Sequence, residues 1–254
     1  MGRGRPWTRE EVIVAYALYC VIPFSKLNNS NRTIKDVAEK IGRSPASLKM
    51  KISNLAALDP DFLASGRVGL WGGVSKLDRE VFAEFSNDWQ RLSSLAEELV
   101  ELPIFDLETP IYNGPVHRRK KTYAEISEKQ ARKFFRKSVI AAYEGCCCIT
   151  GMKTPELLIA SHIKPYYQSD KSERANPANG LLLNAFYDRA FDKGLMTVLP
   201  DLTIKISNVI DRTHADETTR KWLFGVEGMK IKRPARFAPK RELLAYHNQY
   251  IFLR

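Results

Sequence analysis

Residues 148–197 read CITGMKTPELLIASHIKPYYQSDKSERANPANGLLLNAFYDRAFDKGLMT, and this stretch decides how the rest of the chain is interpreted. An apolar run ends in Ser161-His162, and a polar loop follows it. The chain then passes through Asn179-Gly180 and a second apolar segment before it reaches Asp188 and Asp192. One histidine and two carboxylates therefore fall within a single short stretch.

The coarse secondary structure of this stretch can bring these groups together. Residues 157–163 are apolar with strand character, so His162 is expected at a strand end, and Pro165 breaks the strand. Residues 181–183 form a second short apolar segment before a predicted helix. Asp188 and Asp192 lie four residues apart in that helix and so share one face. Strand, loop and helix can therefore converge on a gap the size of a metal ion.

These residue types suit the hydrolysis of a phosphodiester. A histidine with a pKa near neutrality can take the proton of an attacking water. A hard divalent cation held by carboxylate oxygens can stabilise the charge that develops on the phosphoryl group. A lone histidine on an apolar strand is more often an ordinary core residue, so the assignment of His162 depends on Asn179 and Asp188.

The motifs SHIKP and NPANGLLLNAFYDRAFD resemble those of HNH endonucleases, the ββα-metal nucleases found in bacterial restriction-like proteins. The resemblance implies that His162 is the general base and that Asn179 braces the loop that bears it. It also implies that Asp188 binds the catalytic metal, Mg²⁺ or Mn²⁺, with Asp192 as a weaker candidate ligand. The expected phosphate contacts are Lys164, Arg174 and Arg189.

Three positions depart from the family pattern. Many members have an aspartate directly before the base histidine, and this chain has Ser161. Many members also hold a structural zinc with two CxxC pairs, of which only Cys148 remains here, so no structural zinc is expected. The third is Asp188, where the family usually has histidine or asparagine; a carboxylate remains a good ligand for Mg²⁺.

The N-terminal region predicts short helices with clear start signals. Thr8 with Glu11, and Thr33 with Asp36, have capping-box spacing, and Ser44-Pro45 begins a third helix. Two short helices joined at a glycine resemble a helix-turn-helix. Its expected DNA contacts are Arg43, Ser47, Lys49 and Lys51. The alternative is a helical hairpin that packs on its own domain.

The charge of the chain favours a polyanionic partner. The formal net charge is +11 and the sequence pI is about 9.5, which suits phosphate neutralisation.

Three prolines in residues 101–115 indicate a boundary between two domains. We expect a helical DNA-recognition domain in residues 1–105, a basic linker in 106–124 and an HNH nuclease domain in 125–254. Further expected DNA contacts in the linker are Arg118, Arg119, Lys120 and Lys121.

The sequence thus predicts an α+β protein with a mainly helical N-terminal domain and an HNH domain with flanking helices. The expected activity is metal-dependent cleavage of double-stranded DNA in restriction or another defence. The alternatives are a DNA-binding regulator with an inactive HNH module, and a nonspecific DNA or RNA nuclease. Double-strand cleavage with one site per chain suggests a homodimer. No signal peptide or membrane span is found, and the cysteine pattern favours a reduced, cytoplasmic setting. The expected localisation is the cytoplasm of a bacterium or archaeon.

Overall fold

A computed structural model describes residues 5–105 and 123–254 of the chain. The N-terminal part is helical and contains α1 (Arg9–Val21), α2 (Arg32–Lys40), α3 (Pro45–Ala56), α4 (Pro60–Ala64), α5 (Lys76–Phe85) and α6 (Trp89–Val100). The C-terminal part is mixed and contains α7 (Tyr123–Ala142), β1 (Leu158–His162), α8 (Lys171–Arg174), β2 (Gly180–Asn184), α9 (Ala185–Asp192), β3 (Met196–Val198), β4 (Ile204–Ile206), α10 (Glu217–Trp222) and α11 (Arg241–Tyr250). The predicted α+β class is confirmed.

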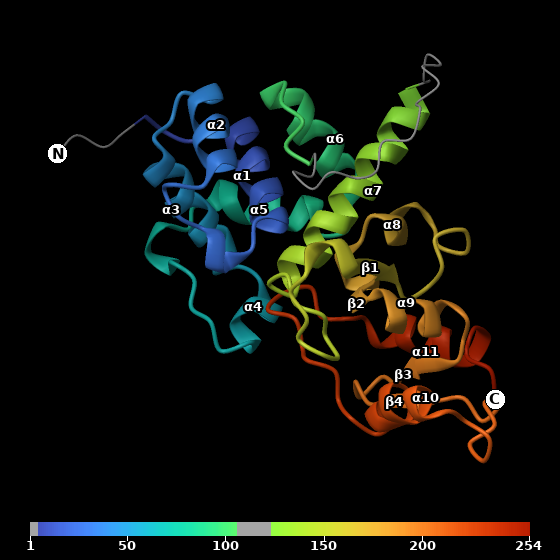
Figure 1. Ribbon diagram of the computed structural model, residues 1–254. Helices are drawn as coiled ribbons and strands as arrows, with labels where there is room; N and C mark the ends of the chain where they lie inside the picture. The colour runs from blue at the N-terminus through green and yellow to red at the C-terminus, as the bar shows by residue number, and fades with distance from the viewer. Residues whose placement is uncertain (1–4, 106–122) are drawn as a thin grey trace.

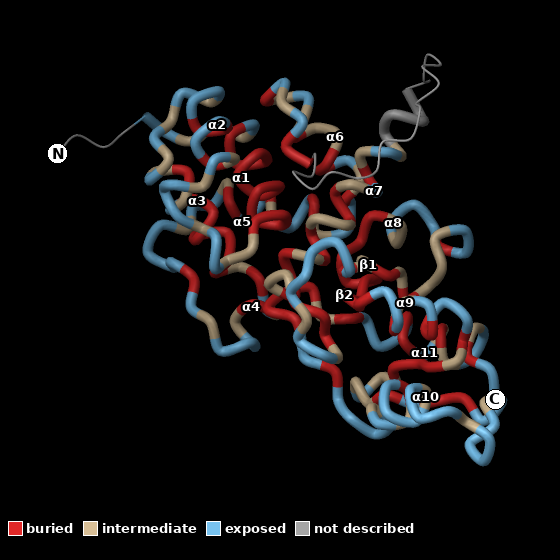
Figure 2. The backbone as a smooth tube through the Cα atoms, viewed as in Figure 1, coloured by how far each residue is buried: buried red, intermediate tan, exposed pale blue. Residues whose placement is uncertain are grey.

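Helix α1 is the centre of the N-terminal part. Every residue from Glu11 to Val21 is buried, because α3, α5, α6 and α7 all pack around it. Figure 2 shows this helix as a buried segment among partly exposed ones. Its first turn carries the predicted capping box, in which Thr8 and Glu11 exchange hydrogen bonds with each other's backbone amides. A helix this apolar on all sides needs such complete burial.

Helices α2 and α3 form at the positions that the capping signals indicated, with one difference. Asn31, rather than Thr33, caps α2, because its side chain accepts the hydrogen bond from the Ile34 amide at 3.1 Å. Gly42 follows α2 with a φ of +64°, a conformation in which glycine has no steric cost. Ser44 caps α3 as predicted. Residues 65–75 form a loop with one short 3₁₀ turn.

Two of the predicted DNA contacts are buried inside the N-terminal part. The Arg43 guanidinium donates to the Glu11 carboxylate at 2.7 Å and lies 4.4 Å from the centre of the Trp7 ring. The Lys51 ammonium lies 2.8 Å from the Asp78 carboxylate, and both side chains are almost fully buried. The DNA contacts of Arg43 and Lys51 stay a prediction, although each cation already has a carboxylate partner within the fold. Ser47 and Lys49 are partly exposed and stay predicted contacts.

Replacement of Lys51 by methionine is expected to destabilise the protein by about 3 kcal/mol, because the buried Asp78 carboxylate loses its partner. Lys49→Met is the matched control, two residues away on the same helix. A partly exposed lysine without such a partner contributes about 0.5 kcal/mol or less to stability. Urea unfolding of the two variants measures the difference. Equal unfolding midpoints would show that the Lys51–Asp78 pair does not stabilise the fold.

Helix α7 connects the two halves of the molecule. It packs against α1 and α6 on one side and against β1 and β2 on the other, as Figure 1 shows for the long helix between the two groups of elements. The buried apolar residues form one continuous core from α1 through α7 to the strands. The predicted linker lies largely outside the described residues, as do Arg118, Arg119, Lys120 and Lys121. The domain boundary stays a prediction.

The two strands within residues 148–197, β1 and β2, form an antiparallel pair. Ser161 pairs with Leu181 and His162 pairs with Gly180. A side chain at Gly180 would come within 2.3 Å of Val139 on α7, so the close contact between strand and helix requires glycine there. Helix α9 follows β2 directly and packs on both strands. Residues 148–197 therefore contain two paired strands and a helix that packs on them.

The C-terminal segment returns to the N-terminal helices. The Ala235 amide donates to the Ala142 carbonyl at the end of α7, at 2.8 Å. Beyond it, the Arg236 guanidinium is buried and donates to the carbonyl oxygens of Tyr19 and Ile22, at the end of α1. Arg236 thereby satisfies carbonyls that have no partner within α1. Among the described helices, none combines the length and the apolarity needed to cross a membrane.

Candidate active site

His162 is held rigidly at the end of β1. Its ring stacks on Phe135 of α7, with 3.7 Å between ring centres and 9° between planes. Its Nε2 lies 3.0 Å from the carbonyl oxygen of Arg174. A carbonyl oxygen only accepts, so in the neutral ring Nε2 carries the proton and Nδ1 keeps its lone pair. No described residue makes a hydrogen bond to Nδ1, so this nitrogen is available to a water molecule.

The surroundings of His162 favour its neutral form. Burial lowers the pKa of the imidazole below its ordinary value of 6.5, and the positive charge of Arg132 lowers it further. The hydrogen bond to Arg174 acts in the opposite direction but is the smaller effect. At neutral pH the ring is therefore an unprotonated base, which is the form that can accept a proton from water.

Asn179 fixes the loop that follows His162. Its Oδ1 accepts the hydrogen bond from the Lys164 amide at 2.9 Å. Its Nδ2 lies within hydrogen-bond distance of the Lys164 carbonyl, Ser169 Oγ and the Glu173 carbonyl. The Asn179 carbonyl also accepts from the Ile163 amide at 2.9 Å. This fully buried side chain joins both ends of the loop, which is the arrangement expected of a bracing residue.

Asp188 and Asp192 lie one turn apart on α9 and face the same cavity as His162. The cavity has a volume of about 460 Å³. Burial, followed by the negative charge of Asp192, raises the pKa of Asp188. Asp192 is exposed overall, yet the partial loss of hydration at the cavity wall also raises its pKa. Two carboxylates that disfavour each other's charge form a donor set that suits a divalent cation.

Ser161, which stands in the family's usual aspartate position, also lines this cavity. Its Oγ is buried and has no hydrogen-bond partner among the described residues. The hydroxyl lies near enough to Asp188 to lower the pKa of that carboxyl. The Ser161 hydroxyl therefore lies beside the Asp188 carboxylate at the cavity wall.

The family model of HNH endonucleases matches residues 147–199 of the chain. Residues 147–199 form an HNH endonuclease domain. The match contains β1, the loop with Asn179, β2 and α9, and so includes His162, Asp188 and Asp192. Comparison with curated proteins finds no match for the chain.

No complete metal-binding group is preformed in the HNH domain. Within residues 5–105 and 123–254, no three His, Cys, Asp or Glu side chains come together as such a group. Cys148 is buried, and burial raises the pKa of its thiol well above the ordinary value. Asn184 caps α9 by accepting from the Tyr187 amide at 3.0 Å. The expectation that the domain needs no zinc stays a prediction.

The three cations expected to contact phosphate differ in their surroundings. The Lys164 ammonium is 2.7 Å from the Glu173 carboxylate, which raises the lysine pKa. Arg174 donates from Nε to the Ser169 carbonyl at 3.0 Å, and its guanidinium lies over the Tyr166 ring. Arg189 is exposed and lines the cavity beside Asp188. Arg189 alone of the three lines this cavity, and all three stay predicted phosphate contacts.

Sequence reasoning missed two aromatic stacks that position the site. Phe135 lies under His162, and its only sequence signal is its place in an apolar pair on a basic helix. His247 of α11 stacks on Phe191 of α9 at the same distance of 3.7 Å between ring centres. His247 also accepts from Thr197 Oγ1 at Nδ1 and donates from Nε2 to the Phe191 carbonyl. It thereby anchors the helix that carries both aspartates.

The buried His247 predicts a stability that falls in acid. Burial lowers its pKa to about 4, whereas an unfolded histidine has a pKa of about 6.5. The unfolded state therefore binds the proton first as the pH falls from about 6.5 toward 4, with a loss of about 3 kcal/mol. Urea unfolding at pH 7 and pH 4 should show this loss in the wild type relative to His247→Gln. Asp188 and Asp192 have raised pKa values and so act in the opposite direction, but both proteins contain them, so the comparison cancels their effect. If the difference in unfolding free energy between wild type and variant were the same at both pH values, the assignment of the low pKa to His247 would be wrong.

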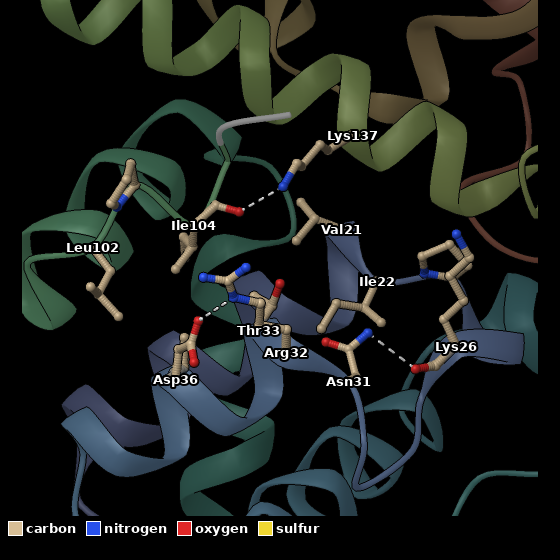
Figure 3. A pocket seen from close by; sticks show the side chains of 13 residues that line it. Val21, Ile22, Lys26, Asn31, Arg32, Thr33, Asp36, Leu102, Ile104 and Lys137 are labelled. Carbon is tan, nitrogen blue, oxygen red and sulfur yellow. Dashed lines mark hydrogen bonds and ion pairs between the residues drawn. The ribbon is translucent and has the colours of Figure 1, made fainter. Parts of the chain in front are cut away.

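A second cavity lies among the N-terminal helices, away from His162. It has a volume of about 560 Å³ and is formed by the end of α1, the start of α2, residues 102–104 and α7. Figure 3 shows Arg32 directed toward Asp36, and Lys137 toward the Ile104 carbonyl. Asp36 is the only carboxylate among its described lining residues. The chemistry expected of the HNH domain therefore belongs to the cavity at His162.

Proposed function

We propose that the protein is a metal-dependent DNA endonuclease that hydrolyses phosphodiester bonds in the cavity between β1 and α9. The observation that carries this proposal is the placement of His162. Its Nε2 is occupied by the Arg174 carbonyl and its Nδ1 is available, in a cavity that Asp188 also lines. A neutral, oriented imidazole beside a carboxylate pair suits the activation of water for attack on phosphorus.

In the proposed reaction, His162 acts as the general base. Nδ1 accepts the proton of the attacking water, and the resulting imidazolium is stabilised by the Nε2 hydrogen bond to the Arg174 carbonyl. The Phe135 stack prevents rotation of the ring away from the cavity. Asn179 supports this geometry by fixing the loop between Lys164 and Glu173. These contacts position the base before the substrate arrives, which lowers the entropic part of the barrier.

Asp188 and Asp192 fit a hard divalent cation, since burial and then the negative charge of Asp192 raise the pKa of Asp188, and a cation would stabilise both ionised carboxylates. When bound, a cation such as Mg²⁺ supplies positive charge for the phosphoryl oxygens and the leaving 3′-oxygen. Its other ligands would be water and substrate phosphate. Ser161 offers a neutral hydroxyl in place of a further carboxylate, so the metal depends more heavily on Asp188 than in family members with aspartate there.

Incubation of the purified protein with supercoiled plasmid tests the proposal. We expect cutting with Mg²⁺ or Mn²⁺ and none with EDTA. Discrete fragments would indicate a sequence-specific enzyme of restriction or defence, and a smear would indicate a nonspecific one. A parallel reaction with RNA of similar length tests the substrate class. If no metal-dependent cutting of DNA occurs, the endonuclease proposal fails and the inactive-module alternative gains support.

We also propose that the N-terminal helices recognise the DNA, as a homodimer when both strands are cut. The partly exposed Ser47 and Lys49 of α3 support this role, together with the net charge of +11. Lys49 would contact the phosphate backbone. Its replacement would then weaken binding of all sequences to a similar degree and reduce the dependence of affinity on salt.

A further inference from the structure

Tyr167 is an exposed aromatic ring at the edge of the cavity that contains His162. The residue is 87% exposed, more than Val68 or any other large apolar or aromatic residue that is exposed in the described part of the chain. It nevertheless lines the same cavity as His162 and Asp188. A tyrosine that packs against almost nothing adds little to the stability of the fold, so its position at this site calls for a functional explanation.

The preceding tyrosine is unavailable for the same role. The Tyr166 hydroxyl donates to Glu128 at 2.6 Å, and the guanidinium groups of Arg132 and Arg174 lie 4.1 and 4.9 Å from the centre of its ring. Tyr167 has a different environment, since its one described ring contact is edge-on to Tyr166, with 85° between planes. Because the residue is 87% exposed, most of the Tyr167 ring is open to a planar group.

The segment that bears Tyr167 is well defined. The Pro165 carbonyl accepts from the amides of Gln168 and Ser169, at 2.9 and 3.0 Å, which closes a tight turn around the two tyrosines. Ser169 Oγ in turn donates to the Lys164 carbonyl and lies 3.2 Å from Asn179 Nδ2. Asn179, which fixes the loop after His162, thus also fixes the turn that bears Tyr167. An exposed ring on a fixed turn loses little conformational freedom when it binds a partner.

We infer that Tyr167 stacks on a nucleobase next to the phosphate that is cut, and that this base is unpaired or displaced from its helix. Exposed cations at the same cavity, Arg189 and Lys193, can hold the phosphate backbone while the ring receives the base. Every base has a π-face that can stack on tyrosine. In an intact duplex both faces are covered by neighbouring bases, so stacking requires a base that has left the stack. The inference rests on the proposed nuclease function and specifies the substrate within it.

The test uses binding without cleavage, in the His162→Ala background. DNA hairpins carry 2-aminopurine either at an unpaired position or within a fully paired stem of the same length. Tyr167→Ala should weaken binding of the unpaired substrate by roughly 5- to 100-fold, the range of one lost base stack, and should abolish fluorescence quenching by the protein. Tyr167→Trp should retain both. Binding of the paired stem should be unchanged.

Tyr250→Ala is the matched control, because Tyr250 is also an exposed tyrosine, at 63%, but does not line the cavity. The inference fails if Tyr167→Ala binds the unpaired substrate as tightly as the parent does. It also fails if both substrates lose affinity equally, since that result would indicate a general contact with the backbone. Cleavage by otherwise wild-type protein is measured separately with the plasmid. If the protein cuts the plasmid but Tyr167→Ala does not weaken binding of the unpaired substrate, this inference alone is overturned. If the protein does not cut the plasmid, the proposed function is overturned.

Discussion

Replacement of His162 by alanine is expected to reduce the rate of DNA cleavage by about 10³-fold, because general base catalysis contributes about 10²- to 10⁴-fold. Affinity for DNA should remain, since the imidazole nitrogen that faces the Arg174 carbonyl does not bind phosphate. Cleavage rates under single-turnover conditions, together with binding by fluorescence anisotropy, separate the two effects. Cutting at the wild-type rate would remove His162 from the proposed mechanism.

The pH dependence gives a second measure of the same group. Burial lowers the pKa of His162 below 6.5, and only the unprotonated ring can act as a base. The rate should therefore rise with pH, with its midpoint below 6.5, and then stay level through neutral pH. His214→Ala serves as the matched control, because that histidine is exposed and contacts only Asp211 by its ring. It should leave both the rate and the pH profile unchanged.

Asp188→Asn is expected to lower metal-dependent cleavage on the order of 10³-fold. A bound cation contributes several kcal/mol of charge stabilisation in the transition state, and each 1.36 kcal/mol corresponds to tenfold in rate. An amide of nearly the same shape keeps the packing but loses the charge that holds the cation. The measurement is the cleavage rate across a Mg²⁺ titration, in which the variant should require more metal and still not reach the wild-type rate.

The stability of this variant distinguishes lost chemistry from lost folding. Because burial and Asp192 raise the pKa of Asp188, the ionised carboxylate opposes folding at neutral pH, and its removal should leave the urea midpoint equal or higher. Asp192→Asn should have a smaller effect on cleavage, as suits an exposed residue. Glu217→Gln on α10 should have none. Equal losses for Asp188 and Asp192 would assign both carboxylates to the metal.

The capping and glycine signals of the sequence predicted local structure well. Thr8 and Ser44 cap helices as expected, and the glycine of Asn179-Gly180 lies where α7 leaves no room for a side chain. The caps are readable because they depend on neighbours in sequence, whereas the need for glycine at position 180 comes from α7, which is distant along the chain. The resemblance likewise led to residues 147–199, which match the family model.

Contacts between distant segments could not be read from the sequence. Arg43 and Lys51 have the spacing of DNA-contacting residues, but their partners Glu11 and Asp78 lie far away along the chain. Phe135 is one apolar residue among many in its helix, and only the packing of α7 on β1 places it under His162. A charge or ring that is satisfied by a remote partner has no local signature, so sequence reasoning assigns it to the surface or the general core.

The contact of Arg236 with α1 has a consequence for the order in which the protein is made. Helix α1 precedes residue 236 in the chain, so the carbonyls of Tyr19 and Ile22 receive their partner only when residue 236 has left the ribosome. The helix at the centre of the N-terminal part therefore lacks these two hydrogen bonds until the C-terminal part has been made. Full stability of the N-terminal helices is thereby coupled to completion of the C-terminal part.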